Sequence, residues 1–398
     1  MKLGVVTTFP PGKGTLNEYG YHFVRHLEAK PEVTDLALFV DELPAGEAYP
    51  VRDGSRAIVS WKHGSIGNAF RIWRAVRREK PDAVIFNIQF TSFGSGKVSA
   101  ALGLMTPALL RATGTTTIVL LHNLMDTVDL KGAGFTMSGP AEWLTRTVGR
   151  FITKSILRAD LVAVTIPTYV ELLRDRYGAT NVVLAPHGTF EDVPDLPPDP
   201  AGRRTIMAFG KFGTYKKIES LVAAYRLLLA EDARTELVIA GTDSPNAAGY
   251  LAGIAEANAD LPGLTFTGYV AEEDVPRIFL GSDVVVFPYT STTGSSGVLH
   301  QAGEHGRAVA LPDIGDLAEL IREEGYSAVT FQPDDPADLA RAIRGLLDDD
   351  KARHAMGAAN LAAARGLPMA DIVDWYLIHL DEIAADRTAR GRRNAAWT

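Results

Sequence analysis

Two lysines, Lys211 and Lys217, stand on either side of a glycine-bearing turn in the segment Gly-Lys-Phe-Gly-Thr-Tyr-Lys-Lys at 210–217. An apolar run typical of a buried strand precedes the segment, and a helical pattern follows it. Both ammonium groups can therefore face one multiply charged anion, and fixed cations near a helix start stabilise the charge that develops on a departing diphosphate. The alternative is a pair of solvated surface lysines.

A second chemistry-bearing segment, 288–302, reads Pro-Tyr-Thr-Ser-Thr-Thr-Gly-Ser-Ser-Gly-Val-Leu-His-Gln-Ala. It lies between a predicted strand and a predicted helix, and small hydroxyl residues and glycines dominate its first part. Backbone amides and hydroxyls at a helix N-terminus suit phosphate oxygens. A serine nucleophile is the competing interpretation, but the segment lacks the Gly-x-Ser-x-Gly elbow that such a serine requires.

The first half of the chain offers two weaker candidates. Glycines in the loop 9–15, which contains Gly14, would let the backbone approach a ligand, although the loop is equally well explained as a turn. His122 leaves a strongly apolar strand and could contact substrate; the alternative is a hydrogen-bonded core histidine. Asp126 follows it by one helical turn, but without a third ligand we expect no metal site.

Alternating strand and helix patterns must position these residues. Short apolar, β-branched runs separated by amphipathic helical segments predict βαβ units and mostly parallel sheets, which bind ligands beyond the carboxyl ends of their strands. The predicted strands are 3–8, 36–40, 83–87, 116–121, 161–165 and 182–185, then 205–209, 236–240, 264–267, 283–287, 308–311 and 329–331. The predicted helices are 16–29, 68–79, 143–157, 217–229, 247–258, 298–305, 316–323 and 336–347.

A proline-rich, acidic stretch at 187–204 interrupts this alternation and is typical of an interdomain linker. It separates a predicted N-terminal domain, 1–186, from a predicted C-terminal domain, 205–367. The remaining segment, 368–398, begins with an apolar-periodic helix at 369–385. Because this helix follows the last strand of the second domain, we expect it to cross back onto the first.

Composition narrows the possible functions of this 398-residue chain. A net charge of −8 argues against bulk affinity for nucleic acid. The absence of cysteine excludes disulfides, thiolate metal sites and a cysteine nucleophile. No apolar run is long enough to span a membrane. We therefore expect a soluble, cytoplasmic protein; no feature of the sequence specifies its oligomeric state.

Taken together, these segments resemble the retaining glycosyltransferases of the GT-B fold, most closely family 4 (glycosyl transferases group 1). The resemblance rests on the lysine segment, the element 288–309, the turn Pro186-His187-Gly188, Gly-Thr-Asp at 241–243 and Thr-Gly-Tyr-Val at 267–270. It implies an α/β GT-B architecture, with two Rossmann-like, doubly wound domains and a cleft between them. The N-terminal domain would bind the acceptor and the C-terminal domain the nucleotide sugar.

The resemblance also implies roles for individual residues. His122 would contact the transferred sugar, and Lys211 and Lys217 would be the family's diphosphate-binding pair; these three are the catalytic candidates. The expected donor-binding set is Gly14, Gly210, Val270, Thr293, Gly294, Ser295, Ser296, Gly297 and Gln301.

The sequence departs from the family pattern at two positions, because Thr293 and Gln301 replace a signature pair of glutamates. Gln301 can still hydrogen-bond a ribose diol, without the added strength that a charge gives. Thr293 is short and neutral, so recognition of the sugar must differ. Glu304, one helical turn beyond Gln301, is in no register that makes it a clean substitute.

The implied activity is transfer of a hexose, with retention, from a UDP- or GDP-sugar to a hydroxyl acceptor in polysaccharide, glycolipid or glycosylated-metabolite synthesis. Neither a metal nor another cofactor is expected. The altered glutamate pair motivates an alternative, a catalytically inactive nucleotide-binding protein that acts as a partner or regulator. A third possibility keeps catalysis but changes the bond, as in pseudo-glycosidic or phosphorylase-type reactions.

A basic helix predicted at 68–79 could indicate whether the acceptor is lipid-linked. Its arginines, within Arg71–Arg78, lie beside an apolar stripe and could dock on anionic lipid. The alternative is a solvated basic face over a core stripe. If the helix docks, the expected location is the inner face of the cell membrane.

Overall fold

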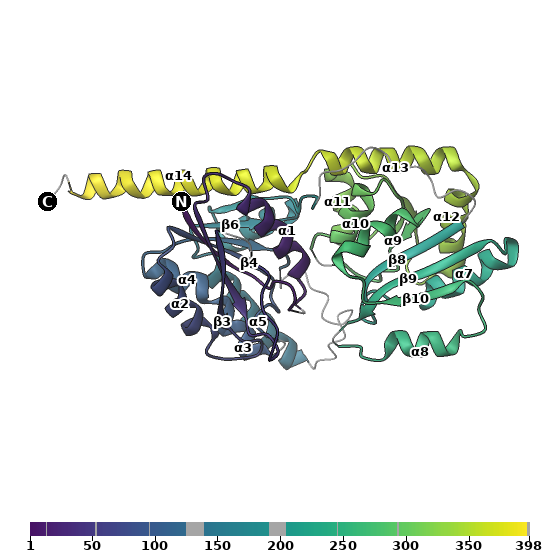
Figure 1. The fold of residues 1–398 in the computed structure, drawn as a ribbon, viewed down its shortest axis with the longest axis horizontal. Helices are drawn as coiled ribbons and strands as arrows, with labels where there is room; N and C mark the ends of the chain where they lie inside the picture. The colour runs from purple at the N-terminus through teal and green to yellow at the C-terminus, as the bar shows by residue number, and fades with distance from the viewer. Residues whose placement is uncertain are drawn as a thin grey trace. The chain divides into compact units, whose positions relative to one another are not determined.

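The computed structural model describes residues 1–12, 14–51, 54–94, 96–124, 139–190, 204–244, 246–292 and 294–395. These residues divide into two compact units, traced in Figure 1. Described residues up to 190, together with those from Met369 onward, form the first unit, and residues 204–368 form the second. Most of the predicted linker 187–204 lies outside the described residues.

The first unit is built on a seven-stranded parallel sheet with the strand order β3-β2-β1-β4-β5-β6-β7. Its central strands β4 and β5 are buried at every residue, because helices cover both faces of a parallel sheet. The strands are β1 (Lys2–Val6), β2 (Asp35–Asp41), β3 (Ser55–Trp61), β4 (Ala83–Ile88), β5 (Thr116–Leu121), β6 (Leu161–Val164) and β7 (Val182–Leu184).

Helices cover the two faces of this sheet unequally (Figure 1). Contacts link α1 with α14 on one face, while α2, α3, α4 and α5 contact one another. Right-handed crossovers place α1 opposite the other four, because the chain moves from β1 to β2 in one direction and from β3 to β6 in the other. The helices are α1 (Asn17–Glu28), α2 (Asn68–Glu79), α3 (Lys97–Leu104), α4 (Thr106–Ala112), α5 (Gly139–Ile156), α6 (Pro167–Tyr177) and α14 (Met369–Ala395).

The C-terminal helix α14 packs on the first unit, as the sequence predicted. Tyr376 is fully buried and meets the ring of Phe23 from α1 edge-on, with ring centroids 5.5 Å apart. Further along, Arg387 pairs with Asp160, the closest nitrogen and oxygen being 2.8 Å apart. The helix continues ten residues beyond its predicted end at 385.

The second unit contains a six-stranded parallel sheet with the order β10-β9-β8-β11-β12-β13. Its core lies largely between the sheet and helices α7 and α12. The strands are β8 (Arg204–Phe212), β9 (Thr235–Asp243), β10 (Leu264–Gly268), β11 (Val284–Val286), β12 (Ala308–Pro312) and β13 (Val329–Phe331). The helices are α7 (Glu219–Glu231), α8 (Tyr250–Ala257), the 3-10 turn η1 (Glu272–Asp274), α9 (Val275–Leu280), α10 (Gly297–Glu304), α11 (Gly315–Glu324), α12 (Pro336–Asp348) and α13 (Asp350–Arg365).

Both sheets are doubly wound, which confirms the predicted fold class. In each sheet the strand order reverses next to the first strand, between β1 and β4 in the first unit and between β8 and β11 in the second. Ligands of open α/β sheets bind beyond the carboxyl ends of the strands at such switch points. None of the described helices is both long and apolar enough to span a lipid bilayer.

Candidate functional site

The switch point of the second unit begins where β8 and β9 end side by side. Gly210 is paired with Gly241, and both adopt positive φ angles, 134° and 131°. A Cβ atom on Gly241 would lie 1.9 Å from the carbonyl oxygen of Gly210, so only glycine fits there. These two glycines let β8 and β9 remain paired through Lys211 and Phe212 to the sheet's carboxyl edge.

The two chemistry-bearing segments that the sequence predicted separately form one structure. Lys216 and Tyr289 make a short antiparallel bridge. The backbone N–H of Lys217 donates to the carbonyl oxygen of Pro288 at 3.0 Å. The turn after β8 is therefore held against the loop after β11, as expected of adjacent strands at a switch point.

Lys216 is the lysine that this pairing positions. Its Nζ lies 4.6 Å from the ring centroid of Tyr289 and 5.9 Å from that of Tyr215, both within cation–π range. The ammonium also lies 3.0 Å from where a Cβ on Gly210 would be, against the carboxyl edge of the sheet. Of the predicted pair, Lys211 lies at the end of β8 and Lys217 in the turn after it, and both side chains are exposed.

The loop between β11 and α10 is braced from a neighbouring helix. The N–H of Gly294 donates to Oδ2 of Asp316 in α11 at 2.6 Å. Burial raises the pKa of the Tyr289 phenol, whose buried hydroxyl has no hydrogen-bond partner among the described residues. Tyr289 contacts Lys216 through its ring and its backbone, so it joins the lysine turn to the loop that leads into α10.

The start of α10 suits an anion. Ser296 occupies the N-cap position with extended backbone, and its side chain does not cap the helix. The first N–H groups of a helix lack intrahelical partners, and the helix dipole adds partial positive charge there. Across the described part of the chain, the buried Oγ of Ser295 finds no hydrogen-bond partner. Gly297, the next predicted donor residue, is the first residue of this helix.

The remaining predictions of the second unit are distributed around this loop. Gln301 lies in α10 and is only 2% exposed. Val270 follows β10 and is half-buried. Glu304 is buried on the same helix as His300, whose Nε2 lies 2.8 Å from Oε2 of Glu324. Thr293 lies outside the described residues, so its predicted contact with the sugar stays a prediction.

Burial and charge act in opposite directions on His300. Burial lowers the pKa of its imidazole, whereas the charge and hydrogen bond of Glu324 raise it, and the pKa is raised overall. His300 of α10 is therefore paired with the carboxylate of Glu324 at the end of α11, and this pair helps to hold the two helices together.

The switch point of the first unit contains His122. Its Nε2 lies 2.6 Å from Oδ1 of Asn87 at the end of β4, and Nδ2 of Asn87 donates to Oγ1 of Thr7 after β1 at 3.0 Å. Since this orientation makes Oδ1 of Asn87 the acceptor, Nε2 of His122 carries the proton. Burial lowers the pKa of His122 to about 3, so its imidazole is neutral.

Other groups near this histidine were not predicted. Tyr19 contacts both His122 and His187, with its ring centroid 4.6 Å and 4.8 Å from theirs.

The predicted residue Gly14 lies in the loop after β1, where a Cβ would approach Cγ2 of Thr8 to 2.4 Å. The structure thus places Gly14 and His122 in the first unit and the other described predictions in the second. Asn87 and Tyr19 are polar and aromatic residues of ordinary elements, and no sequence signal distinguished them.

The described residues contain no group of three or more histidine, aspartate or glutamate side chains that could hold a metal ion. Asp126, which the sequence paired with His122, lies outside the described residues.

Comparison with protein families gives a match to glycosyl transferases group 1 over residues 203–349. A GDP-mannose:cellobiosyl-diphosphopolyprenol alpha-mannosyltransferase of Komagataeibacter xylinus is 26% identical over 175 residues, which is 44% of this chain and 43% of the relative. A D-inositol 3-phosphate glycosyltransferase of a Nocardioides species is 27% identical over 184 residues, 43% of this chain and 39% of the relative. The chain thus spans less than half the length of these curated relatives.

Solved structures resemble the chain over nearly its whole length. Sucrose-phosphate synthase from Thermosynechococcus elongatus has a TM-score of 0.76 and 18% identity, covering 97% of this chain and all (100%) of that one. Anabaena HepE in complex with UDP-glucose has a TM-score of 0.67 and 16% identity, covering 98% and 100%. At these identities the likeness establishes the fold, which is GT-B.

Proposed function

We propose that this chain, whose residues 203–349 belong to glycosyl transferases group 1, is a glycosyltransferase that uses a nucleoside-diphosphate sugar. The names of similar proteins support a diphosphate donor: the Komagataeibacter relative is named for GDP-mannose, and HepE was crystallised with UDP-glucose. The diphosphate is the part that these two donors share. It is also the part of the donor that the lysines and the start of α10 in the second unit are suited to bind.

The observation that carries the proposal is the cationic switch point of the second unit. Lys211 lies at the end of β8, and Lys216 and Lys217 lie in the turn that follows. Hydrogen bonds join that turn to the loop leading into the uncapped start of α10. Hydrogen bonds between charged groups contribute about 1.5–3 kcal/mol each. A few such bonds to phosphate oxygens would bind a diphosphate and stabilise the charge it gains as it leaves.

We further propose that a hexose is transferred with retention and without a metal ion. The acceptor oxygen would bond to the anomeric carbon on the face from which the diphosphate departs. The bond from that carbon to the phosphate oxygen breaks, and the acceptor proton passes to the departing diphosphate. Lysine ammonium groups and helix amides would take the place of a metal in neutralising the leaving group.

Other residues keep subsidiary roles in this proposal. His122 would contact the transferred sugar through a neutral imidazole, and Gln301 would hydrogen-bond the ribose. The first unit would bind the acceptor. The Komagataeibacter relative is named for a polyprenol-linked acceptor, so a peripheral membrane contact through Arg71–Arg78 also belongs to the proposal.

The test is nucleotide release from a panel of UDP-, GDP- and dTDP-sugars, combined with calorimetric titration of the free nucleotides. Sugar-dependent release supports the transferase. Binding of a nucleotide with no release from any donor would favour the alternative, an inactive nucleotide-binding protein. Absence of both binding and release would reject the proposal.

Variants distinguish the lysines. Lys216→Ala and Lys211→Ala are each expected to weaken diphosphate binding about tenfold to a hundredfold, which corresponds to the loss of one charged hydrogen bond. The matched control is Lys351→Ala, because Lys351 is exposed on α13 in the same unit. Thermal melting shows whether each variant is folded. Equal nucleotide affinities for all three variants and the wild type would contradict the proposal that these lysines bind the diphosphate.

A further inference from the structure

The helical layer formed by α2, α3, α4 and α5, here the α2–α5 layer, differs in charge from the rest of the chain. Its helices contain nine lysines and arginines against two glutamates, although the whole chain has a net charge of −8. The basic residues are distributed over all four helices rather than concentrated in one. They are Arg71, Arg74, Arg77, Arg78, Lys97, Arg111, Arg146, Arg150 and Lys154.

Large apolar side chains are exposed on the same layer. Trp143 and Phe151 of α5 are 67% and 60% exposed, and Phe70 of α2 is 59% exposed. Smaller apolar side chains on α3, α4 and α5 join them: Val98, Leu102, Leu109 and Val148. Exposed aromatic residues on several contacting helices are unusual for a face that meets only water.

Helix α5 shows how the two properties combine. Trp143, Arg150, Phe151 and Lys154 follow one another at seven-, one- and three-residue steps, which places them along one side of a helix. All four are exposed, while Ile152 between them is buried. Basic residues beside tryptophan and phenylalanine are typical of helices that lie in the headgroup region of a bilayer.

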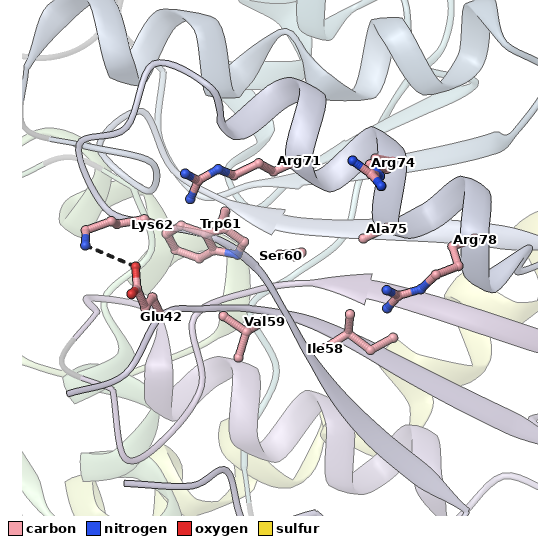
Figure 2. A pocket seen from close by; sticks show the side chains of 10 residues that line it. All are labelled: Glu42, Ile58, Val59, Ser60, Trp61, Lys62, Arg71, Arg74, Ala75 and Arg78. Atoms are coloured by element: carbon pink, nitrogen blue, oxygen red, sulfur yellow. Dashed lines mark ion pairs between the residues drawn. The ribbon is translucent and has the colours of Figure 1, made fainter. Parts of the chain in front are cut away.

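A cleft at the edge of the layer adds a specific site for an anionic group. It lies between α2 and the edge strand β3 and has a volume of about 780 Å³. Figure 2 shows Arg71, Arg74 and Arg78 on α2 with the apolar side chains of Ile58 and Val59 on β3.

Two of these arginines are available to a ligand. Arg78 pairs with Glu79 at 3.0 Å, and Lys62 at the far end of the cleft pairs with Glu42 at 3.1 Å. Within the described ranges, neither Arg71 nor Arg74 has an acidic partner. A guanidinium group binds phosphate oxygens in a bidentate manner, and the apolar wall would accommodate the carbon atoms next to the phosphate.

We propose that the α2–α5 layer docks on a bilayer that contains anionic lipid. Trp143, Phe151 and Phe70 enter the interface, the surrounding basic residues face the headgroups, and Arg71 and Arg74 hold a headgroup phosphate in the cleft. A bilayer fits better than an acidic protein because cations and apolar groups alternate across four helices, where each finds its own mobile partner in a fluid surface. This inference rests on the membrane contact through Arg71–Arg78 proposed above and extends it to the whole layer, but it does not depend on the activity of the second unit.

Vesicle flotation of the full-length chain tests the proposal. Wild type is expected to float with phosphatidylcholine vesicles that contain phosphatidylglycerol, not with phosphatidylcholine alone, and to detach as salt is added. Reversal of two charges, in Arg150→Glu with Lys154→Glu, is expected to weaken binding at least about thirtyfold. The matched control reverses two charges on the second unit, Arg322→Glu with Lys351→Glu, and should leave binding unchanged.

Variants of the exposed aromatic residues test insertion. Trp143→Ala with Phe151→Ala should bind more weakly, whereas Ile378→Ala, which removes a 59% exposed apolar side chain on α14, should not. Trp143→Phe should still bind while losing the blue shift of fluorescence that vesicles cause in wild type. Circular dichroism confirms folding, which substitution of exposed side chains is not expected to disturb.

A separate pair of variants tests the role of the cleft. Arg71→Ala with Arg74→Ala should weaken binding to anionic vesicles by about tenfold or more. Failure of wild type to float with anionic vesicles, equal flotation with neutral ones, or equal losses in the layer and control variants would each overturn the proposal. Binding to an acidic polymer such as heparin without binding to vesicles would overturn it as well.

Discussion

Acid should destabilise the first unit through His122, and the direction follows from its burial. The side chain is 7% exposed, and burial lowers the pKa of its imidazole to about 3, compared with about 6.5 in an unfolded chain. Between these two values the unfolded chain binds a proton that the folded chain does not. Stability from this histidine is therefore complete above about pH 6.5 and is lost as the pH falls toward 3.

The size of the effect follows from the same two pKa values. A one-proton difference changes the free energy of unfolding by about 1.4 kcal/mol per pH unit once the pH is well below 6.5. Integrated from pH 7.5 to pH 5, this gives a loss of about 2 kcal/mol. The rings of Tyr19 and His187 lie against His122. Among the described residues, burial is the one cause of the lowered pKa, and no carboxylate favours the imidazolium.

The assay is urea unfolding followed by tryptophan fluorescence at both pH values. Residues 191–368 contain no tryptophan, so the signal reports on the first unit, which contains His122. The comparison is with His122→Gln, whose side-chain N–H can still donate to Oδ1 of Asn87. Groups that titrate in both proteins cancel in this comparison.

Wild type should lose about 2 kcal/mol more stability than His122→Gln between pH 7.5 and pH 5. An equal loss in both proteins would show that His122 takes up its proton in the folded state as easily as in the unfolded one. In that case the buried, neutral imidazole assigned here would be wrong.

Two further changes test the second unit. Gly241→Ala should cost more than about 3 kcal/mol of stability, measured by urea unfolding with far-UV circular dichroism, because a Cβ would lie 1.9 Å from the oxygen of Gly210. Its control, Gly345→Ala on α12, meets nothing within 4 Å and should stabilise by about 0.5–1 kcal/mol; similar effects for both would contradict the close approach. Asp316→Ala removes the acceptor for the N–H of Gly294 and should raise the donor KM about tenfold; an unchanged KM would mean that this brace does not support donor binding.

Much of the fold was predictable because buried parallel strands form continuous apolar runs. Strands such as β4 and β5, buried at every residue, were identified for this reason. The edge strand β3 was missed, since most of its residues are only partly buried and its sequence, Ser-Arg-Ala-Ile-Val-Ser-Trp, contains no such run. Helices α3, α4, α6, α9 and α13 were also missed. Helix α9 is only six residues long, and α13 has a weakly apolar face rich in alanine.

The candidate site was predictable as two segments but not as one structure. Local sequence identified the turn at 210–217 and the loop at 288–302, because glycine, lysine and hydroxyl residues have recognisable roles. Which lysine is held in place depends on Tyr289, more than seventy residues away in sequence, and on the bridge it makes with Lys216. No local pattern contains that pairing, so Lys216 was not singled out.

The two switch points share a topology and differ in chemistry, and this difference supports the different ligands proposed for them. In the second unit, Lys216 and an uncapped helix start supply positive charge, which suits phosphate oxygens. In the first unit, Thr7, Asn87 and a neutral His122 form a chain of uncharged hydrogen bonds. Burying a diphosphate against that chain would leave its charge unpaired, at a cost of several kcal/mol. Sugar and acceptor hydroxyls carry no charge and can both donate and accept hydrogen bonds, so we infer that they are the ligands of the first switch point.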